Sequence, residues 1–254
     1  MRISKNQIYA ILTGATLVAA YFTFSIVRPP KLEFQDRAFP QGFRNLVMES
    51  VLSKFDPLFG LPPTPLVGAE PKQGAQEVCD ALFRDPDSPA VGSRDSEIQI
   101  AAFLDYRCPY CKTLTNIISK LQSDNIRIVY KEWPILGDSS VLAARAGLAA
   151  NKQGKYLAFH TRMMNSKFVA TVAYIEDIAV ELGINLAQLN KDMNSELTTR
   201  AIQRTSTLAS SLGFTGTPAL IVGRTIVQGE ITQSQLARLI ENEILQPPLV
   251  CPAV

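Results

Sequence analysis

Two cysteines stand where a predicted β-strand gives way to a predicted helix, and this arrangement restricts the fold more than any other feature of the chain. Residues 97–104 read EIQIAAFL, a pattern that alternates and then becomes apolar, as in a central strand. Cys108 and Cys111 follow, and residues 113–124 have helical periodicity. The first thiol then lies at the N-terminus of a helix, where free amides and the helix dipole favour thiolate over thiol. We therefore predict a redox-active dithiol.

Two other interpretations of the cysteine pair are a zinc site and a purely structural disulfide. Pro109 and Tyr110 fill the loop, and a proline fits the first helical turn because its missing N–H has no partner there in any case. Zinc needs four ligands, but Cys79 and Cys251 are single and distant, and His160 is the only histidine in the sequence. A disulfide across so short a loop contributes little loop entropy. Both interpretations are weaker than the redox dithiol, and we predict no metal.

The rest of the compact region alternates between strand and helix patterns, which indicates an α/β fold. We expect a helix over residues 73–84, strands over 126–130, 219–222 and 225–228, a helical region over about 138–212, and a closing helix over 232–245. This predicted domain begins near residue 73 and runs to residue 254.

The N-terminus predicts export from the cytoplasm. Residues 8–27 carry no charge, and twenty helical residues span about 30 Å, the thickness of a bilayer core. Residues 1–30 are therefore expected to hold a cytoplasmic N-terminus and a transmembrane anchor. A signal peptide cleaved near Ala20 is the alternative, which leaves a soluble exported protein. Either way the remainder lies where disulfides persist.

Residues 31–72 are expected to form an extension, part spacer and part helix. Over Gln41–Phe55 the apolar residues Phe43, Val47 and Val51 recur every four positions, and Phe55 continues the series. This amphipathic helix either folds back on the main domain or joins several copies of the chain, because an isolated helix of this length is marginal in water.

The remaining composition excludes some partners and leaves one bridge open. Twenty-five basic residues against 23 acidic ones give a net charge of +2, and no basic stripe predicts nucleic-acid binding. Cys79 and Cys251 lie near the two ends of the predicted domain, and domain termini are often close together. A second, structural disulfide between them and a pair of free buried thiols are both open alternatives.

Two segments carry a resemblance to a known family. Phe103–Lys112 (FLDYRCPYCK) and Phe214–Ala219 (FTGTPA) are similar to the DsbA-like thiol–disulfide oxidoreductases, over about residues 75–245. The resemblance implies a thioredoxin fold with a helical insertion, and a cis proline at Pro218 that faces the dithiol. It also implies that Thr217 tunes the redox potential. The long extension resembles the suppressor-of-copper-sensitivity branch, in which some members trimerise and act as isomerases.

The chain departs from the family pattern at two positions. Where the strong oxidant of the family has Pro-His, this chain has Pro109 and Tyr110, so one partner of the Cys108 thiolate is missing and we expect a weaker oxidant. Ala102 stands where related folds often bury an acid. We expect Glu132, at the end of the next strand, to handle the proton of Cys111, the alternative being a surface or capping Glu.

The expected chemistry is thiol–disulfide exchange on exported proteins, without metal or organic cofactor. Cys108 forms the mixed disulfide with the substrate and Cys111 resolves it. An oxidase needs a quinone-linked membrane partner, whereas an isomerase or reductase needs a membrane electron donor. A membrane-tethered binding module with a structural dithiol is the third alternative.

Overall fold

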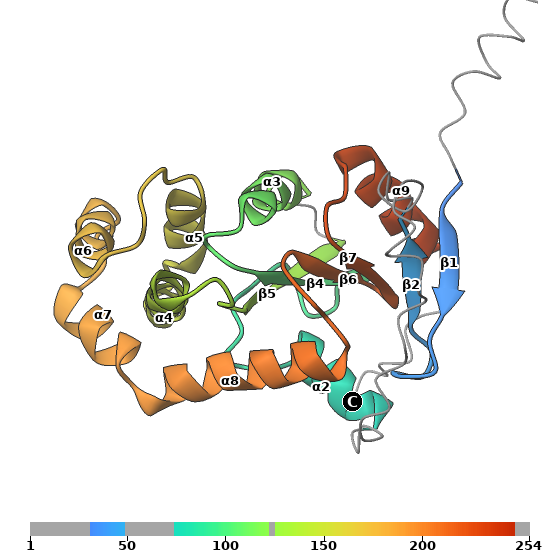
Figure 1. Ribbon diagram of the computed structural model, residues 1–254, viewed down its shortest axis with the longest axis horizontal. Helices are drawn as coiled ribbons and strands as arrows, with labels where there is room; N and C mark the ends of the chain where they lie inside the picture. The colour runs from blue at the N-terminus through green and yellow to red at the C-terminus, as the bar shows by residue number, and fades with distance from the viewer. Residues whose placement is uncertain (1–30, 49–73, 122–124, 247–254) are drawn as a thin grey trace, which may run out of the picture. The chain divides into compact units, whose positions relative to one another are not determined.

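The computed structural model describes residues 31–48, 74–121 and 125–246. A seven-stranded mixed sheet runs through it in the order β1-β2-β7-β6-β4-β5-β3 (Figure 1). The strands are β1 (Glu33–Asp36), β2 (Arg44–Val47), β3 (Ala90–Val91), β4 (Ile98–Leu104), β5 (Ile126–Glu132), β6 (Ala219–Val222) and β7 (Thr225–Gln228).

The apolar strand β4 lies at the centre of the sheet, as its sequence predicts. It pairs in parallel with β5, so that Ala102 lies opposite Tyr130, and antiparallel with β6, where Phe103 lies opposite Ala219. Helices cover both faces of β4, which explains why its residues have no polar alternation in their second half. The parallel pair ends at one edge of the sheet, and the cysteine motif follows at that edge.

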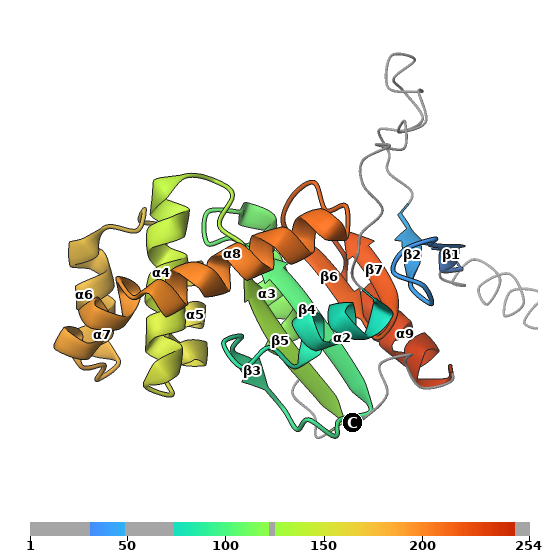
Figure 2. The same ribbon diagram turned by 90° about the horizontal axis from the view of Figure 1, so that it is seen from below.

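Helices pack on both faces of the sheet and beside it. In Figures 1 and 2, α2 and α8 cover one face, and α3 and α9 cover the other. The helices are α2 (Ala75–Phe83), α3 (Pro109–Ile118), α4 (Asp138–Lys152), α5 (Tyr156–Met164), α6 (Val172–Glu181), α7 (Leu186–Met193), α8 (Glu196–Ser211) and α9 (Gln233–Ile244). This is the thioredoxin-like α/β fold with a helical insertion that the resemblance implies.

The helical insertion has an apolar core of its own. Helices α4 to α7 lie together beside the sheet (Figure 2), and alanines of α4 pack against Phe159, Ile178 and Leu189 of the following helices. Helix α8 then returns across the sheet, where Leu208 and Leu212 join the main core. The insertion is therefore a second packed layer attached to the catalytic sheet.

The predicted helix over Gln41–Phe55 is wrong in the part that the structure describes. Arg44–Val47 form the strand β2, which pairs in parallel with β7. Phe43 is 2 % exposed and packs in the main core, whereas Val47 is 45 % exposed. Phe43 is therefore buried within its own chain and is not available to join several copies of it.

Some predictions concern residues outside the described ranges. The expected anchor within residues 1–30 is one of them, and so are Val51, Phe55 and Cys251. Within the described ranges, none of the helices has the length and apolarity needed to cross a bilayer.

Candidate active site

The site begins at Cys108, which caps the N-terminus of α3. Its sulfur accepts a hydrogen bond from the backbone N–H of Cys111 at 3.3 Å, and Pro109 occupies the first turn. The thiol of Cys108 also points to the carbonyl oxygen of Thr217, 3.2 Å away and 109 residues later in the chain. The cysteine motif and the second family segment thus meet at this sulfur.

The loop before β6 brings Thr217 and Pro218 to the dithiol. The Thr217–Pro218 peptide bond is cis, in agreement with the resemblance. Strand β6 starts at the next residue, Ala219, which lies opposite Phe103 of β4. Because β4 leads directly into the cysteine motif, this pairing fixes the position of Thr217 beside Cys108.

The two thiols have unequal environments. A hydrogen bond from the Cys111 thiol, together with contacts to Thr217 and the backbone amides of the helix N-terminus, lowers the pKa of Cys108 to about 6, although burial opposes this shift. Burial raises the pKa of Cys111, and the neighbouring Cys108 thiolate raises it further. Cys111 is fully buried and Cys108 is 4 % exposed. Cys108 is therefore suited to be the nucleophile, and Cys111 stays protonated until a proton acceptor is available.

Asp105, which was not among the predicted site residues, supports this loop. Its carboxylate is buried and accepts hydrogen bonds from the amides of Arg107, Ile135 and Leu136 and from the hydroxyl of Ser140. It thereby joins the cysteine loop to the loop after β5. An Asp directly after an apolar strand is a typical turn-forming residue, and this was the signal available in the sequence.

Glu132 lies at the end of β5, as expected, but its contacts are not with the cysteines. It is 3 % exposed, and Oε1 accepts hydrogen bonds from the hydroxyls of Tyr106 at 2.8 Å and Tyr156 at 2.7 Å. Oε2 has no hydrogen-bond partner among the residues that the structure describes. His160, the only histidine in the sequence, is fully buried next to this carboxylate.

Residues 99–241 match the DSBA-like thioredoxin domain, which spans more than half of the chain. The chain belongs to this family. The matched residues include nearly all of β4, the dithiol, the helical insertion and the Thr217–Pro218 loop. This DSBA-like protein is a thiol–disulfide oxidoreductase.

Known relatives agree with this assignment. The chain is 22 % identical over 170 residues to the probable disulfide bond formation protein D of Bacillus cereus, which covers 61 % of this chain and 78 % of the relative. A thioredoxin-like oxidoreductase from Silicibacter pomeroyi is 39 % identical, with a TM-score of 0.63, covering 66 % of this chain and 98 % of that structure. The catalytic domain of Proteus mirabilis ScsC is 30 % identical, with a TM-score of 0.60, covering 66 % and 94 %.

The other cysteine that the structure describes, Cys79, is bonded in a disulfide. It lies on α2 and is buried in the main core, while Cys108 and Cys111 are free thiols. Its predicted partner Cys251 lies outside the described residues, and the Cys79–Cys251 pairing stays a prediction.

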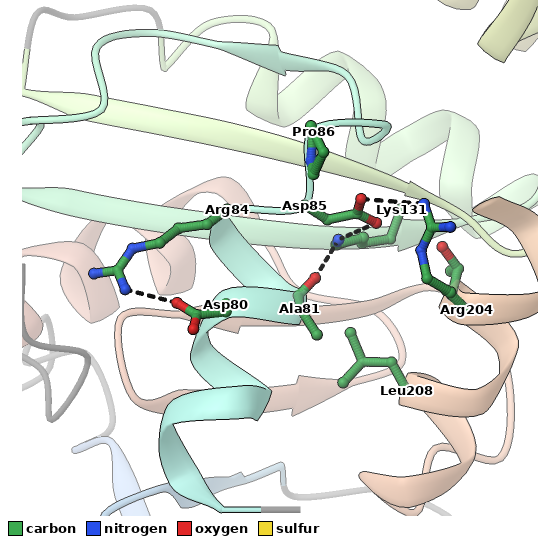
Figure 3. Close-up of a pocket in the computed structure, with 9 residues that line it drawn as sticks. Asp80, Ala81, Arg84, Asp85, Pro86, Lys131, Arg204 and Leu208 are labelled. Atoms are coloured by element: carbon green, nitrogen blue, oxygen red, sulfur yellow. Dashed lines mark hydrogen bonds and ion pairs between the residues drawn. The ribbon is translucent and has the colours of Figure 1, made fainter. Parts of the chain in front are cut away.

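A cavity of about 280 Å³ lies between α2 and α8, on the face opposite to α3. Figure 3 shows Lys131 there, with dashed lines to Ala81 and Asp85. The buried ammonium donates hydrogen bonds to the carbonyl of Ala81 at 2.5 Å and to the hydroxyl of Ser88 at 2.8 Å, and it lies 3.8 Å from the carboxylate of Asp85. Burial lowers the pKa of Lys131 to about 8. Because its donors are occupied, this cluster ties β5 to α2 and is separate from the dithiol.

A smaller cavity, of about 190 Å³, begins next to the cysteine motif. Its lining includes Tyr106, Arg107, Phe168 and Val169. Phe168 is 73 % exposed, and Tyr110 within the motif is 54 % exposed. The surroundings of Cys108 therefore include apolar side chains that face solvent.

Proposed function

We propose that this protein is an exported oxidase that introduces disulfides into other proteins through Cys108 and Cys111. The oxidised pair accepts a substrate thiolate at Cys108, and a second substrate thiol then releases the product with a new disulfide. A quinone-linked membrane protein reoxidises the pair. The uncharged run of residues 8–27 supports a location in the periplasm, anchored to the inner membrane or released from it by cleavage.

The unequal pair of thiols carries this proposal. At pH 7, a pKa of about 6 in place of the ordinary 9.0 favours the reduced pair by about 1.4 kcal/mol, because the Cys108 thiolate is stabilised. That free energy corresponds to a reduction potential raised by about 30 mV. A pair that is more stable when reduced passes its disulfide on more readily.

The isomerase alternative loses its main structural support. It rested on a helix through Phe43 that joins several copies of the chain, but Phe43 is buried within its own core beside β2. The cysteine motif still favours an isomerase. Its Pro109-Tyr110 dipeptide has no imidazole that would stabilise the Cys108 thiolate further, which makes the pair a weaker oxidant. The reductase alternative has the same support, and the experiment below separates both from the oxidase.

Substrates are expected to be unfolded exported chains. The exposed aromatic rings of Tyr110 and Phe168 near the motif suit apolar segments that a folded substrate would bury. The missing N–H of Pro218 leaves the backbone of Thr217 to pair with an extended peptide beside Cys108, in the manner of an added strand.

Thiol trapping in intact cells tests the direction of the reaction. An oxidase holds Cys108 and Cys111 mostly as a disulfide, and a dithiol in most molecules would overturn the proposal in favour of an isomerase or reductase. Non-reducing gels test the roles of the thiols: Cys111→Ala should capture exported proteins as mixed disulfides, and Cys108→Ala should capture none. Equal capture by both variants would reject the assignment of Cys108 as the attacking thiol.

A further inference from the structure

We propose that a buried hydrogen-bonded relay of Thr115, His160, Tyr156 and Glu132 exchanges a proton with Cys111 during catalysis. The inference rests on the dithiol chemistry proposed above and adds four positioning residues to it. Cys111 is fully buried, so its proton needs a route when the sulfur changes between thiol and thiolate.

The relay is continuous from α3 to the end of β5. The Thr115 hydroxyl lies 3.2 Å from Nε2 of His160, and Nδ1 of the same ring lies 3.1 Å from the hydroxyl of Tyr156. The Tyr156 hydroxyl is 2.7 Å from Oε1 of Glu132. Tyr106 provides a parallel branch, 3.1 Å from Nδ1 and 2.8 Å from Oε1.

With both tyrosine hydroxyls donating to Glu132, a hydrogen can be assigned to one nitrogen of the His160 ring. Each tyrosine hydroxyl has one hydrogen, and both are donated to Oε1 of Glu132. Nδ1 of His160 must then carry a hydrogen of its own, because both hydroxyl oxygens can only accept from it. Nε2 is left to accept from Thr115 in the neutral ring, or to donate to it in the imidazolium.

The ring of His160 lies beside one acidic group and three tyrosines. Glu132 receives its hydrogen bonds as a carboxylate, and in the described part of the chain the only ion-pair partner within 4.0 Å of it is His160, at 3.8 Å. The titratable groups that face the ring are Glu132, Tyr106, Tyr130 and Tyr156, the tyrosines having ring centroids 5.0 to 5.3 Å from it. Burial raises the pKa of all three tyrosines, so they stay neutral. An imidazolium next to Glu132 is therefore a compensated charge.

The relay ends one helical turn from the buried thiol. Thr115 follows Cys111 by four residues, and both belong to the buried face of α3. Residues four apart are neighbours on a helix surface. Helix α4 contributes Gly147, where an added Cβ would lie 2.6 Å from the hydroxyl of Tyr106, so the relay occupies the space that a larger side chain would need.

The proton step balances in both directions. When a substrate thiolate attacks Cys108, the Cys108–Cys111 bond breaks and the leaving Cys111 thiolate takes a proton from Thr115, whose hydroxyl is refilled from the His160 imidazolium. In the reverse step, Cys111 gives its proton through Thr115 to Nε2 and attacks the sulfur of Cys108. The substrate thiolate then departs, and the protein pair is oxidised.

Glutathione disulfide separates the two steps in the reduced protein. Cys108 first attacks it to form a mixed disulfide, and Cys111 then resolves that intermediate; acid quenching with mass analysis measures both rates. Thr115→Val keeps the shape and removes the hydroxyl. We expect it to slow resolution by about tenfold to a hundredfold. This rate effect is at or below the lower limit for general acid–base catalysis, because the relay residues act on Cys111 through one another. The attack by Cys108 should not change.

The pH profile and two further variants make the test decisive. Without the relay, the resolution rate should rise about tenfold per pH unit, because solvent has to remove the proton, whereas the unmodified protein should show a shallower slope. Glu132→Gln, which keeps an acceptor for both tyrosines but removes the charge, should behave like Thr115→Val. Thr113→Val, an exposed position on the same helix, is the matched control and should leave both rates unchanged.

Three outcomes would overturn the relay. They are an unchanged resolution rate and slope in Thr115→Val and Glu132→Gln, equal slowing of both steps, or slowing by Thr113→Val as well. If one of the two relay variants does not fold, the other decides. Because glutathione disulfide replaces the exported substrate, this result is independent of whether the protein acts as an oxidase in the cell.

Discussion

The hydrogen bond from the Cys111 thiol is the largest contribution to the low pKa of Cys108, and it can be removed selectively. Cys111→Ala deletes the donor, whereas Cys111→Ser replaces it with a hydroxyl of similar size that still donates. Hydrogen bonds to charged groups contribute about 1.5 to 3 kcal/mol, and one pKa unit corresponds to about 1.36 kcal/mol. The alanine variant should therefore raise the pKa of Cys108 by about one to two, and the serine variant should leave it low.

The midpoint of a titration, and not a rate at a single pH, has to be measured. At pH 7 a thiol with a pKa of about 6 is about nine-tenths thiolate, and one with a pKa of about 7.5 is about one quarter thiolate. The more basic thiolate is also the stronger nucleophile, by about four- to sixfold for that change in pKa. The two effects nearly cancel, so alkylation at pH 7 would not distinguish the variants.

Thiolate absorbance at 240 nm against pH gives the midpoint directly. The unmodified reduced protein should titrate first near pH 6, the serine variant close to it, and the alanine variant near pH 7 to 8. Identical midpoints for the alanine and serine variants would refute the reasoning, because the low pKa of Cys108 would then come from the helix N-terminus and Thr217 alone.

Three further predictions concern stability. Phe43→Ala should lower the free energy of unfolding by about 3 to 5 kcal/mol in urea, because the ring is buried in the main core, and Val47→Ala should change it by less than about 0.5 kcal/mol; equal effects would contradict the placement of β2. Cys79→Ser should cost about 2 to 5 kcal/mol, and a non-reducing peptide map should identify the bonded partner. Gly147→Ala should lower stability by about 1 to 3 kcal/mol, since its Cβ meets the hydroxyl of Tyr106; an unchanged melting temperature would show that the space is not tight.

The sequence predicts the central sheet well and its edge poorly. The strand over 98–104 and the helix after the cysteines follow from local patterns, since apolar runs and turn residues mark their ends. The predicted helix over 41–55 fails because residues four apart share a face both in a helix and in a strand, so the spacing does not distinguish the two periods. The parallel pairing with β7 makes residues 44–47 a strand, and β7 lies about 180 residues later in the sequence.

The candidate site also has a part that the sequence predicts and a part that it does not. The attacking and resolving roles of the two cysteines are predictable from their order at a helix start, and the position of Thr217 followed from the family resemblance. The contacts of His160 were not predictable, because its partners come from α3, α5, β5 and the loop after β4. Each of these side chains alone is compatible with an ordinary buried or capping role.

Two consecutive charged residues at the end of β5, Lys131 and Glu132, lie on opposite faces of the sheet and have different surroundings. Neighbouring strand residues point to opposite faces, so Lys131 faces α2 and α8 while Glu132 faces α5. Lys131 has hydrogen bonds to Ala81 and Ser88 and an ion pair with Asp85, which offset its burial. These contacts offset the burial of Lys131 only in part, since its pKa is still lowered to about 8. Within the described structure, Glu132 keeps one oxygen without a hydrogen-bond partner, and its other oxygen lies 3.8 Å from Nδ1 of His160. The side of the sheet that carries the dithiol therefore holds the incompletely paired carboxyl group, and the opposite side holds the lysine that ties β5 to α2.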